Sequence, residues 1–195
     1  SGVPLIACKC KTCTSKDPRN SRTRASISVQ IGDRVFLIDT SPDLRSQALR
    51  EKLTWIDAVL YTHPHADHIH GVDDLRSFNF IMARPIDCYG NEWTTGELRS
   101  KFDYIFKPTQ IGGGKPMLNL HLIKKPALIQ GIKIIPLPLL HGKMPVLGFR
   151  IQNIAYITDC NLIPDKTIKL LRNLDVLVLD CLRPQEHTTH LNVEA

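Results

Sequence analysis

The sequence lacks any apolar run close to the roughly 20 residues that a membrane-spanning helix requires. Its opening residues, SGVPLIACKCKTC, lack the pattern of a secretory signal. No internal repeat, low-complexity tract or linker divides the 195 residues, which suit a single domain, 1–195. Lys and Arg outnumber Asp and Glu by 25 to 19, yet no basic block occurs. A dedicated nucleic-acid surface is therefore not indicated, although the net charge of +6 would suit an anionic substrate.

The sequence contains only six cysteines, and three of them lie in one segment. Cys8, Cys10 and Cys13 form a C-x-C-x-x-C cluster, and three thiols cannot pair off among themselves as disulfides. The spacing predicts three ligands of a structural zinc ion in a loop at 8–13, with a fourth ligand from elsewhere; a reduced, solvated loop is the alternative. Either interpretation indicates a reducing compartment and hence the cytoplasm. The remaining cysteines lie in hydrophobic contexts and are expected to be buried: Cys88, Cys160 and Cys181.

The pattern of apolar residues predicts a mixed α/β fold. Residues 25–39 are typical of a hairpin turning at Gly32-Asp33, and 146–159 of another turning near Gln152-Asn153. Further strands are expected at 56–62, 86–90, 118–123, 132–139 and 174–181, the last of them fully buried. Helices are expected at 41–52 with Ser41 as N-cap, and at 71–81, 93–106 and 163–173. Strands covered by helices predict a layered sandwich with its chemistry along one edge.

The stretch YTHPHADHIHGV at 61–72 concentrates half of the eight histidines in one loop. A polar, solvated turn is the simplest interpretation, but imidazoles and carboxylates at this spacing are also metal ligands. Other ligand-type residues also follow apolar strands: Asp39, His141 and Asp159. Each alone could be a turn residue. Together they favour a shared site, and they could converge on a pair of metal ions.

The H-x-H-x-D-H motif at 63–68, with Asp39, His141 and Asp159, resembles the metallo-β-lactamase fold superfamily. The segments PLPLLHG and YITDCNLIP, with the cysteine cluster, resemble its phosphodiesterase branch, which includes the phosphoribosyl cyclic phosphate phosphodiesterases. The resemblance covers essentially the whole chain. It implies a four-layer αββα sandwich and hydrolysis of a phosphodiester, a small cyclic phosphate above all, by a water that two divalent metal ions, Zn or Mn, activate.

The resemblance also implies a role for each residue of the motif. The first metal would be bound by His63, His65 and His141. Asp67 and His68 would bind the second metal, and Asp159 would bridge both. Asp39 would orient the histidine loop from behind without binding a metal. His190 would lie near the substrate phosphate and give a proton to the leaving group, with Asp67 as an alternative donor. Cys8, Cys10 and Cys13 would bind the structural zinc.

Two histidines of the family pattern have no counterpart in this sequence, one for the second metal and one for the structural zinc. We therefore expect the chain to lack the first strand of the fold and its C-terminal segment. A transfer-RNA 3′-end processing nuclease and a thioester hydrolase share most of the motif, and a non-catalytic zinc-stabilised binding module is the alternative from another class. We expect a small-molecule substrate, no nucleic acid and no membrane as partners; a homodimer remains open.

Overall fold

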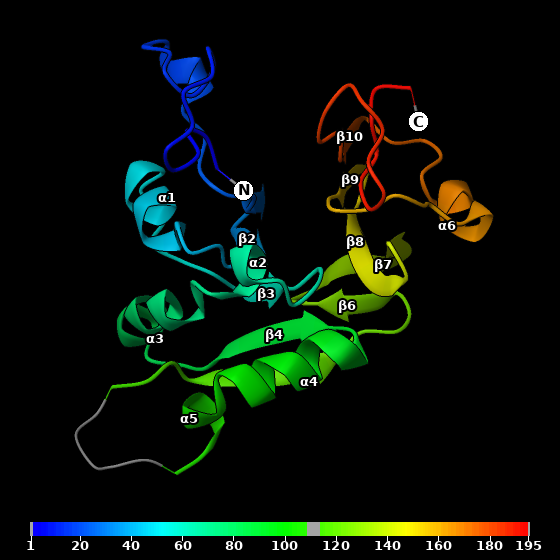
Figure 1. Ribbon diagram of the computed structural model, residues 1–195. Helices are drawn as coiled ribbons and strands as arrows, with labels where there is room; N and C mark the ends of the chain where they lie inside the picture. The colour runs from blue at the N-terminus through cyan, green and yellow to red at the C-terminus, as the bar shows by residue number, and fades with distance from the viewer. Residues whose placement is uncertain (1, 109–113, 195) are drawn as a thin grey trace.

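The computed structural model describes residues 2–108 and 114–194, and these residues form two five-stranded sheets packed face to face (Figure 1). The first sheet contains, in order, β1 (Ile27–Ile31), β2 (Arg34–Ile38), β3 (Ala58–Leu60), β4 (Ile86–Gly90) and β5 (Leu118–Leu122). The second contains β10 (Val176–Leu179), β9 (Ile154–Ile157), β8 (Met144–Ile151), β7 (Ile132–His141) and β6 (Ala127–Ile129).

Helices cover the outer face of each sheet. The helices over the first sheet are α1 (Leu44–Arg50), α2 (Ala66–Ile69), α3 (Leu75–Met82), α4 (Glu92–Lys101) and α5 (Asp103–Phe106), with the 3-10 turns η1 (Pro18–Asn20) and η2 (Val72–Asp74) nearby in the chain. The short helix α6 (Asp165–Leu170) packs beside the second sheet. The layers are therefore helix, sheet, sheet, helix, which confirms the αββα sandwich predicted from the resemblance.

The main core lies between the sheets. Phe36, Ile38 and Leu60 of the first sheet pack against Ile134 and Phe149 of the second, and all five side chains are fully buried. Burying such a side chain contributes roughly 1.5–3 kcal/mol. A second cluster joins the first sheet to its helices, where Val59 and Ile86 contact apolar residues of α2, α3 and α4. Both faces of β3 are covered, which is why this strand is apolar throughout.

Strand direction brings the polar strand ends to one edge. β2, β3 and β4 run parallel, so the segments after β2 and β3 leave the sheet side by side. β7 and β9 both run antiparallel to β8, so their carboxyl ends also lie at one edge of the second sheet. The turns at Gly32, with φ +56°, and at Gln152, with φ +55°, are the predicted hairpin turns.

Several predicted helix boundaries were wrong. The first helix begins at Leu44 with Asp43 as its N-cap, because the Ser41 hydroxyl instead accepts from the Asp43 N–H and donates to Gln47. The helix expected over 93–106 is broken at Phe102 into α4 and α5. The histidine loop contains one helical turn, α2, and β6 was not foreseen. The ends of helices depend on individual hydrogen bonds, which the periodicity of apolar residues does not predict.

The last strand was predicted to be fully buried, and this was wrong. All four residues of β10, Val176–Leu179, are 42–46% exposed, since β10 is an edge strand paired with β9 alone among the residues described. Cys181, which follows it, is exposed rather than buried, whereas Cys88 and Cys160 are buried as expected. Within 2–108 and 114–194, no helix is long and apolar enough to cross a membrane.

Candidate metal centre

The predicted ligand residues come together where the ends of β2, β3, β7 and β9 meet. Two sets of side chains each place their ligand atoms within 4.8 Å of one another: His63, His65 and His141, and His63, His68 and Asp159. The Asp159 Oδ2 atom lies 3.3 Å from His68 Nε2 and 3.7 Å from His63 Nε2. A ligand atom of Asp159 also lies within 4.8 Å of one of His141, so this carboxylate adjoins the first set as well. Asp67 is more peripheral, with its Oδ1 4.0 Å from His68 Nε2.

Asp39 lies beneath the histidine loop and is fully buried. Its Oδ1 accepts a hydrogen bond from the Thr62 backbone N–H at 2.8 Å. Its Oδ2 accepts from the Thr62 hydroxyl and from His68 Nδ1, each at 2.7 Å. A buried carboxylate with three donors is well compensated for the loss of water. Asp39 thus fixes the start of the loop and one of its rings at the same time.

These hydrogen bonds determine which nitrogen of each ring is free. The Thr62 hydroxyl gives its single proton to Asp39, so it must accept from Nδ1 of His63 at 3.0 Å. His141 Nδ1 donates to the Thr189 carbonyl at 2.7 Å. With Nδ1 engaged in His63, His68 and His141, the Nε2 atoms are left to face the centre, as metal-binding imidazoles require.

Both aspartates at the centre adopt a left-handed backbone conformation. The φ angle is +61° at Asp39, which directly follows β2, and +49° at Asp159, which is separated from the end of β9 by one residue. Such a conformation costs most L-residues about 1 kcal/mol or more, although Asp and Asn tolerate it better than most. The turn lets the chain leave the strand while its carboxylate stays at the sheet edge.

Burial and neighbouring charges give the histidines of the centre different pKa values. Burial and the neighbouring rings lower the pKa of His63 to about 2. Burial also opposes charge on His68, but the carboxylates of Asp39 and Asp159 outweigh it and raise its pKa to about 10. Burial opposes ionisation of Asp159, yet the hydrogen bond and charge of His68 hold the pKa of Asp159 well below its usual range. Without a cation, the His68 proton therefore supplies the positive charge between two carboxylates.

His190 joins the centre from the C-terminal segment. Its ring lies 4.7 Å from that of His141, centroid to centroid, and one of its nitrogens falls within 4.8 Å of ligand atoms of His141 and Asp159. Its Nδ1 lies 2.9 Å from Oδ2 of Asp180. Asp180 was not predicted as part of the site, although it follows an apolar strand as Asp39 and Asp159 do. Thr62, Thr189 and Lys101 were not predicted either; the Lys101 Nζ donates to the Pro64 carbonyl at 3.0 Å.

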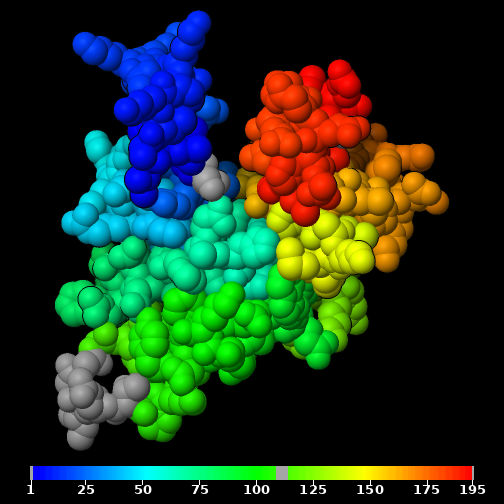
Figure 2. All heavy atoms as spheres, viewed as in Figure 1, coloured from blue at the N-terminus to red at the C-terminus, as the bar shows by residue number. Residues whose placement is uncertain are grey.

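The centre opens into a cleft. Figure 2 shows the N-terminal segment, in blue, and the C-terminal segment, in red, standing on opposite sides of a hollow. On the C-terminal side a cavity of about 650 Å³ borders His190. Polar side chains dominate its lining: Asn161, Arg183, Glu186, His187, Thr188, Asn192 and Glu194. The two histidines without a predicted role lie elsewhere, His70 at the end of α2 against Phe102 and His121 on β5 against Asp87.

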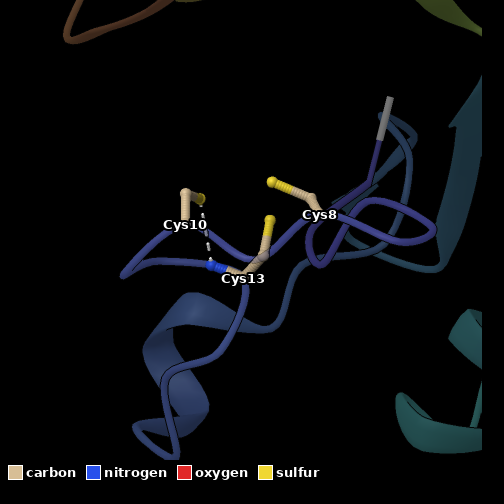
Figure 3. A group of neighbouring side chains, drawn as sticks. All are labelled: Cys8, Cys10 and Cys13. Atoms are coloured by element: carbon tan, nitrogen blue, oxygen red, sulfur yellow. Dashed lines mark hydrogen bonds between the residues drawn. The ribbon is translucent and has the colours of Figure 1, made fainter.

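The three N-terminal thiols are gathered as predicted. The sulfur atoms of Cys8, Cys10 and Cys13 lie within 4.8 Å of one another, with those of Cys8 and Cys13 side by side (Figure 3). The Cys13 N–H donates to the Cys10 sulfur at 3.5 Å. This hydrogen bond, with one from the Cys8 thiol, lowers the pKa of Cys10 to about 7. A thiolate is thus available near neutral pH, and soft sulfur ligands of this kind suit zinc.

Comparisons with known proteins agree with this geometry. A family model described as a beta-lactamase superfamily domain matches residues 34–195. The octanoyltransferase of Porphyromonas gingivalis is 35% identical over 199 aligned residues, covering all of this chain and 40% of that protein. This chain therefore spans less than half the length of that relative. A crystal structure described as a new diphosphatase from the PhnP family is 42% identical, with a TM-score of 0.90, over 99% of this chain and 74% of its own. The Zn²⁺-bound PqqB of Methylobacterium extorquens shares the fold, with a TM-score of 0.71 at 21% identity over 94% of this chain and 70% of its own.

Proposed function

The chain belongs to the beta-lactamase superfamily, on its PhnP-like branch, and on this premise we propose that it is a metal-dependent phosphodiesterase acting on a small cyclic phosphate. The observation that carries the proposal is the convergence of five ligand-type side chains at one sheet edge, where their ligand atoms approach one another: His63, His65, His68, His141 and Asp159. Three of these side chains are buried, His63, His68 and His141, and a non-catalytic binding module would not require so many ligand groups to be gathered at one point.

The donor set fits divalent metal ions. Imidazole Nε2 atoms and a carboxylate are the ligands that Zn²⁺ and Mn²⁺ accept, and the hydrogen bonds of Asp39, Thr62 and Thr189 hold the rings in the required tautomer. One ion would be held by His63, His65 and His141, the other by His68 and Asp67, with Asp159 between them. When bound, the ions would supply an activated water and stabilise charge on the phosphoryl oxygens.

His190 would supply the proton that the leaving group of a phosphodiester needs, which the metal ligands do not provide. The leaving oxygen of an alkyl phosphodiester is strongly basic, so its departure requires a proton. His190 stands beside His141 and Asp159 and borders the polar cavity, where it can reach the leaving group. Asp67, 31% exposed at the mouth of the loop, is the alternative donor. A cyclic diester suits this arrangement, because its leaving oxygen stays attached to the product within reach of the donor.

The dimensions of the site favour a small molecule. The cavity beside His190, about 650 Å³, has the size of a pocket for a compact ligand. Asn, Glu, His and Arg side chains along its wall suit the hydroxyl groups of a polar organic substituent. A transfer RNA would need extended phosphate contacts, and these would require a cationic surface larger than one cavity.

The test is hydrolysis by the protein supplied with Mn²⁺ or Zn²⁺. The substrates are bis(p-nitrophenyl) phosphate, a nucleoside 2′,3′-cyclic phosphate, a symmetrical dinucleoside diphosphate, an octanoyl thioester and a precursor tRNA. Asp159→Asn keeps a residue that tolerates the left-handed backbone but removes the bridging charge, and Asp33→Asn in the exposed turn is the matched control.

We expect cleavage of the two phosphodiesters, with Asp159→Asn slower by at least about a hundredfold, the scale on which removing a charge-stabilising group acts. Asp33→Asn should retain full activity. Cleavage of the diphosphate, the thioester or the tRNA alone would replace the proposed substrate class. Equal rates for Asp159→Asn and the unaltered protein would contradict the proposed centre.

A further inference from the structure

The C-terminal segment pairs His190 with Asp180, a part-buried carboxylate to which the sequence motifs assign no role. Asp180 directly follows β10, and its Oδ2 lies 2.9 Å from Nδ1 of His190. The two side chains are only 9% and 14% exposed. We propose that Asp180 is a positioning residue that holds His190 as the proton donor for the leaving group. This inference rests on the proposed function.

The pair dictates how His190 presents its ring. An ionised carboxylate can only accept a hydrogen bond, so the contact with Asp180 requires the proton on Nδ1. The ring atom left to face the centre is then Nε2, on the side of His141 and Asp159. A hydroxyl in place of the carboxylate could donate as well as accept and would leave both tautomers possible. The carboxylate therefore selects the orientation in which Nε2 can carry a proton into the cleft.

Cys160 ties this pair to the centre through its backbone. The Cys160 N–H donates to Oδ2 of Asp180 at 3.1 Å, and its carbonyl accepts from the Leu191 N–H at 2.7 Å. Leu191 follows His190, and Cys160 follows Asp159, so one fully buried residue fixes both partners of the pair against the bridging carboxylate. A surface ion pair would have no such attachment. These hydrogen bonds therefore fix the position of His190 relative to Asp159.

In the proposed reaction the proton of His190 passes to the departing oxygen. A hydroxide adds to phosphorus, the bond from phosphorus to the leaving oxygen breaks, and its electron pair goes to that oxygen. The oxygen takes the proton from Nε2 of the His190 imidazolium. The product ring is neutral with its proton on Nδ1, which is the tautomer that Asp180 accepts from. Water returns a proton to Nε2 for the next turnover, and the Nδ1 proton stays in its hydrogen bond to Asp180 throughout.

This role predicts a dependence on the leaving group that a purely structural role does not. Asp180→Asn should lower kcat for a nucleoside 2′,3′-cyclic phosphate about 10- to 100-fold, the usual effect of losing a group that orients a functional histidine. With bis(p-nitrophenyl) phosphate, whose leaving group needs no proton, kcat should be nearly unchanged. The content of bound metal should also be unchanged, because the hydrogen bonds of the Asp180 carboxylate involve His190 and the Cys160 N–H, neither of which is assigned as a metal ligand. Asp165→Asn, an exposed carboxylate on α6, is the matched control.

A double-mutant cycle decides whether Asp180 acts through His190. In the His190→Gln background, Asp180→Asn should have no further effect on the cyclic phosphate, because the group that it positions is gone. Additive losses, equal losses on both substrates, or a loss of bound metal would each overturn the proposal and assign Asp180 a structural role.

Nitrogen NMR of the histidine rings gives a readout that needs no activity. Nδ1 of His190, assigned by its loss in His190→Gln, should carry a slowly exchanging proton that Asp180→Asn releases. A His190 ring protonated on Nε2 alone would overturn the proposal even in an active enzyme. An inactive protein that nevertheless shows the Nδ1 proton would contradict the proposed function and leave the positioning by Asp180 supported.

Discussion

Asp39 accepts a hydrogen bond of 2.7 Å from Nδ1 of His68, across 29 positions of sequence, and the same oxygen accepts from the Thr62 hydroxyl that receives the proton of His63. One buried carboxylate therefore sets two of the rings that face the metal centre, one directly and one through a hydroxyl. Neither ring could turn without leaving a buried donor unpaired. This relationship makes the centre testable at residues that would not touch a metal.

Replacing Asp39 by Asn should weaken metal binding without removing a ligand. The amide keeps the shape and tolerates the φ of +61°, but it loses the charge that holds Nδ1–H of His68. We expect divalent metal affinity to fall about 10- to 100-fold, as measured by competition with a chelator. Asp33→Asn, in the exposed β1–β2 turn, should leave the affinity unchanged. Equal affinities for the two variants would show that Asp39 does not orient the ring.

Thr62→Val should uncouple His63 from Asp39. The substitution is nearly isosteric, but it leaves Nδ1–H of the buried His63 without its acceptor. Leaving such a group unpaired costs about 1–3 kcal/mol, which urea unfolding of the metal-free protein can measure. Thr62→Ser retains the hydroxyl and should recover most of the loss. Equal free energies of unfolding for Thr62→Ser and Thr62→Val would show that the hydroxyl does not connect His63 to Asp39.

Metal affinity should rise with pH because His68 must release a proton. In the metal-free protein the pKa of His68 is raised to about 10, so the ring is charged at neutral pH, whereas His63, with its pKa near 2, is already neutral. One proton displaced per site gives about a tenfold gain in affinity per pH unit up to that range. Calorimetry in buffers of different ionisation enthalpy should count this proton at pH 7. A pH-independent affinity would show that His68 enters the complex already neutral.

Gly71 ends the histidine loop at a place where no side chain fits. A Cβ there would lie 2.0 Å from the Ser41 carbonyl oxygen, and the Gly71 N–H donates to Thr40 beneath the loop. Gly71→Ala should destabilise the protein by more than about 3 kcal/mol and displace His68. Gly96→Ala, at an exposed position in the middle of α4 where a Cβ would have nothing within 4 Å, should stabilise it by about 1 kcal/mol. Thermal unfolding of the two variants makes the comparison, and similar melting temperatures would refute it.

Cys10→Ser should remove one bound metal ion without affecting the histidine centre. Its sulfur lies within 4.8 Å of those of Cys8 and Cys13, and a hydroxyl is a far poorer zinc ligand than a thiolate. Elemental analysis should show less zinc per chain, with hydrolysis of a phosphodiester retained. Cys181→Ser, at an exposed thiol apart from the cluster, should keep the full content. Identical zinc contents would mean that the thiols are reduced and free.

Much of the centre was predictable because four of its residues lie in one six-residue motif and the others each follow an apolar strand. Strand ends and the H-x-H-x-D-H spacing placed Asp39, the histidine loop, His141 and Asp159 at one site, and the structure brings all of them together. The exposed β10 was mistaken for a buried strand, because its apolar composition is the same whether or not another layer covers it. Asp180 carried the same strand-end signal as Asp39, but a lone carboxylate gives no indication of its partner.

The sequence by itself determined the elements and the kinds of ligand, since apolar periodicity sets strands and helices and residue chemistry sets what a side chain can bind. Only the tertiary structure decided how those ligands are held. His68 is held by a carboxylate 29 positions away, and His141 by a carbonyl 48 positions away. His190 is held by a carboxylate 10 positions away. A hydrogen bond acts over about 3 Å, so its partner is chosen by the packing of distant segments, and no local pattern in the chain records that choice.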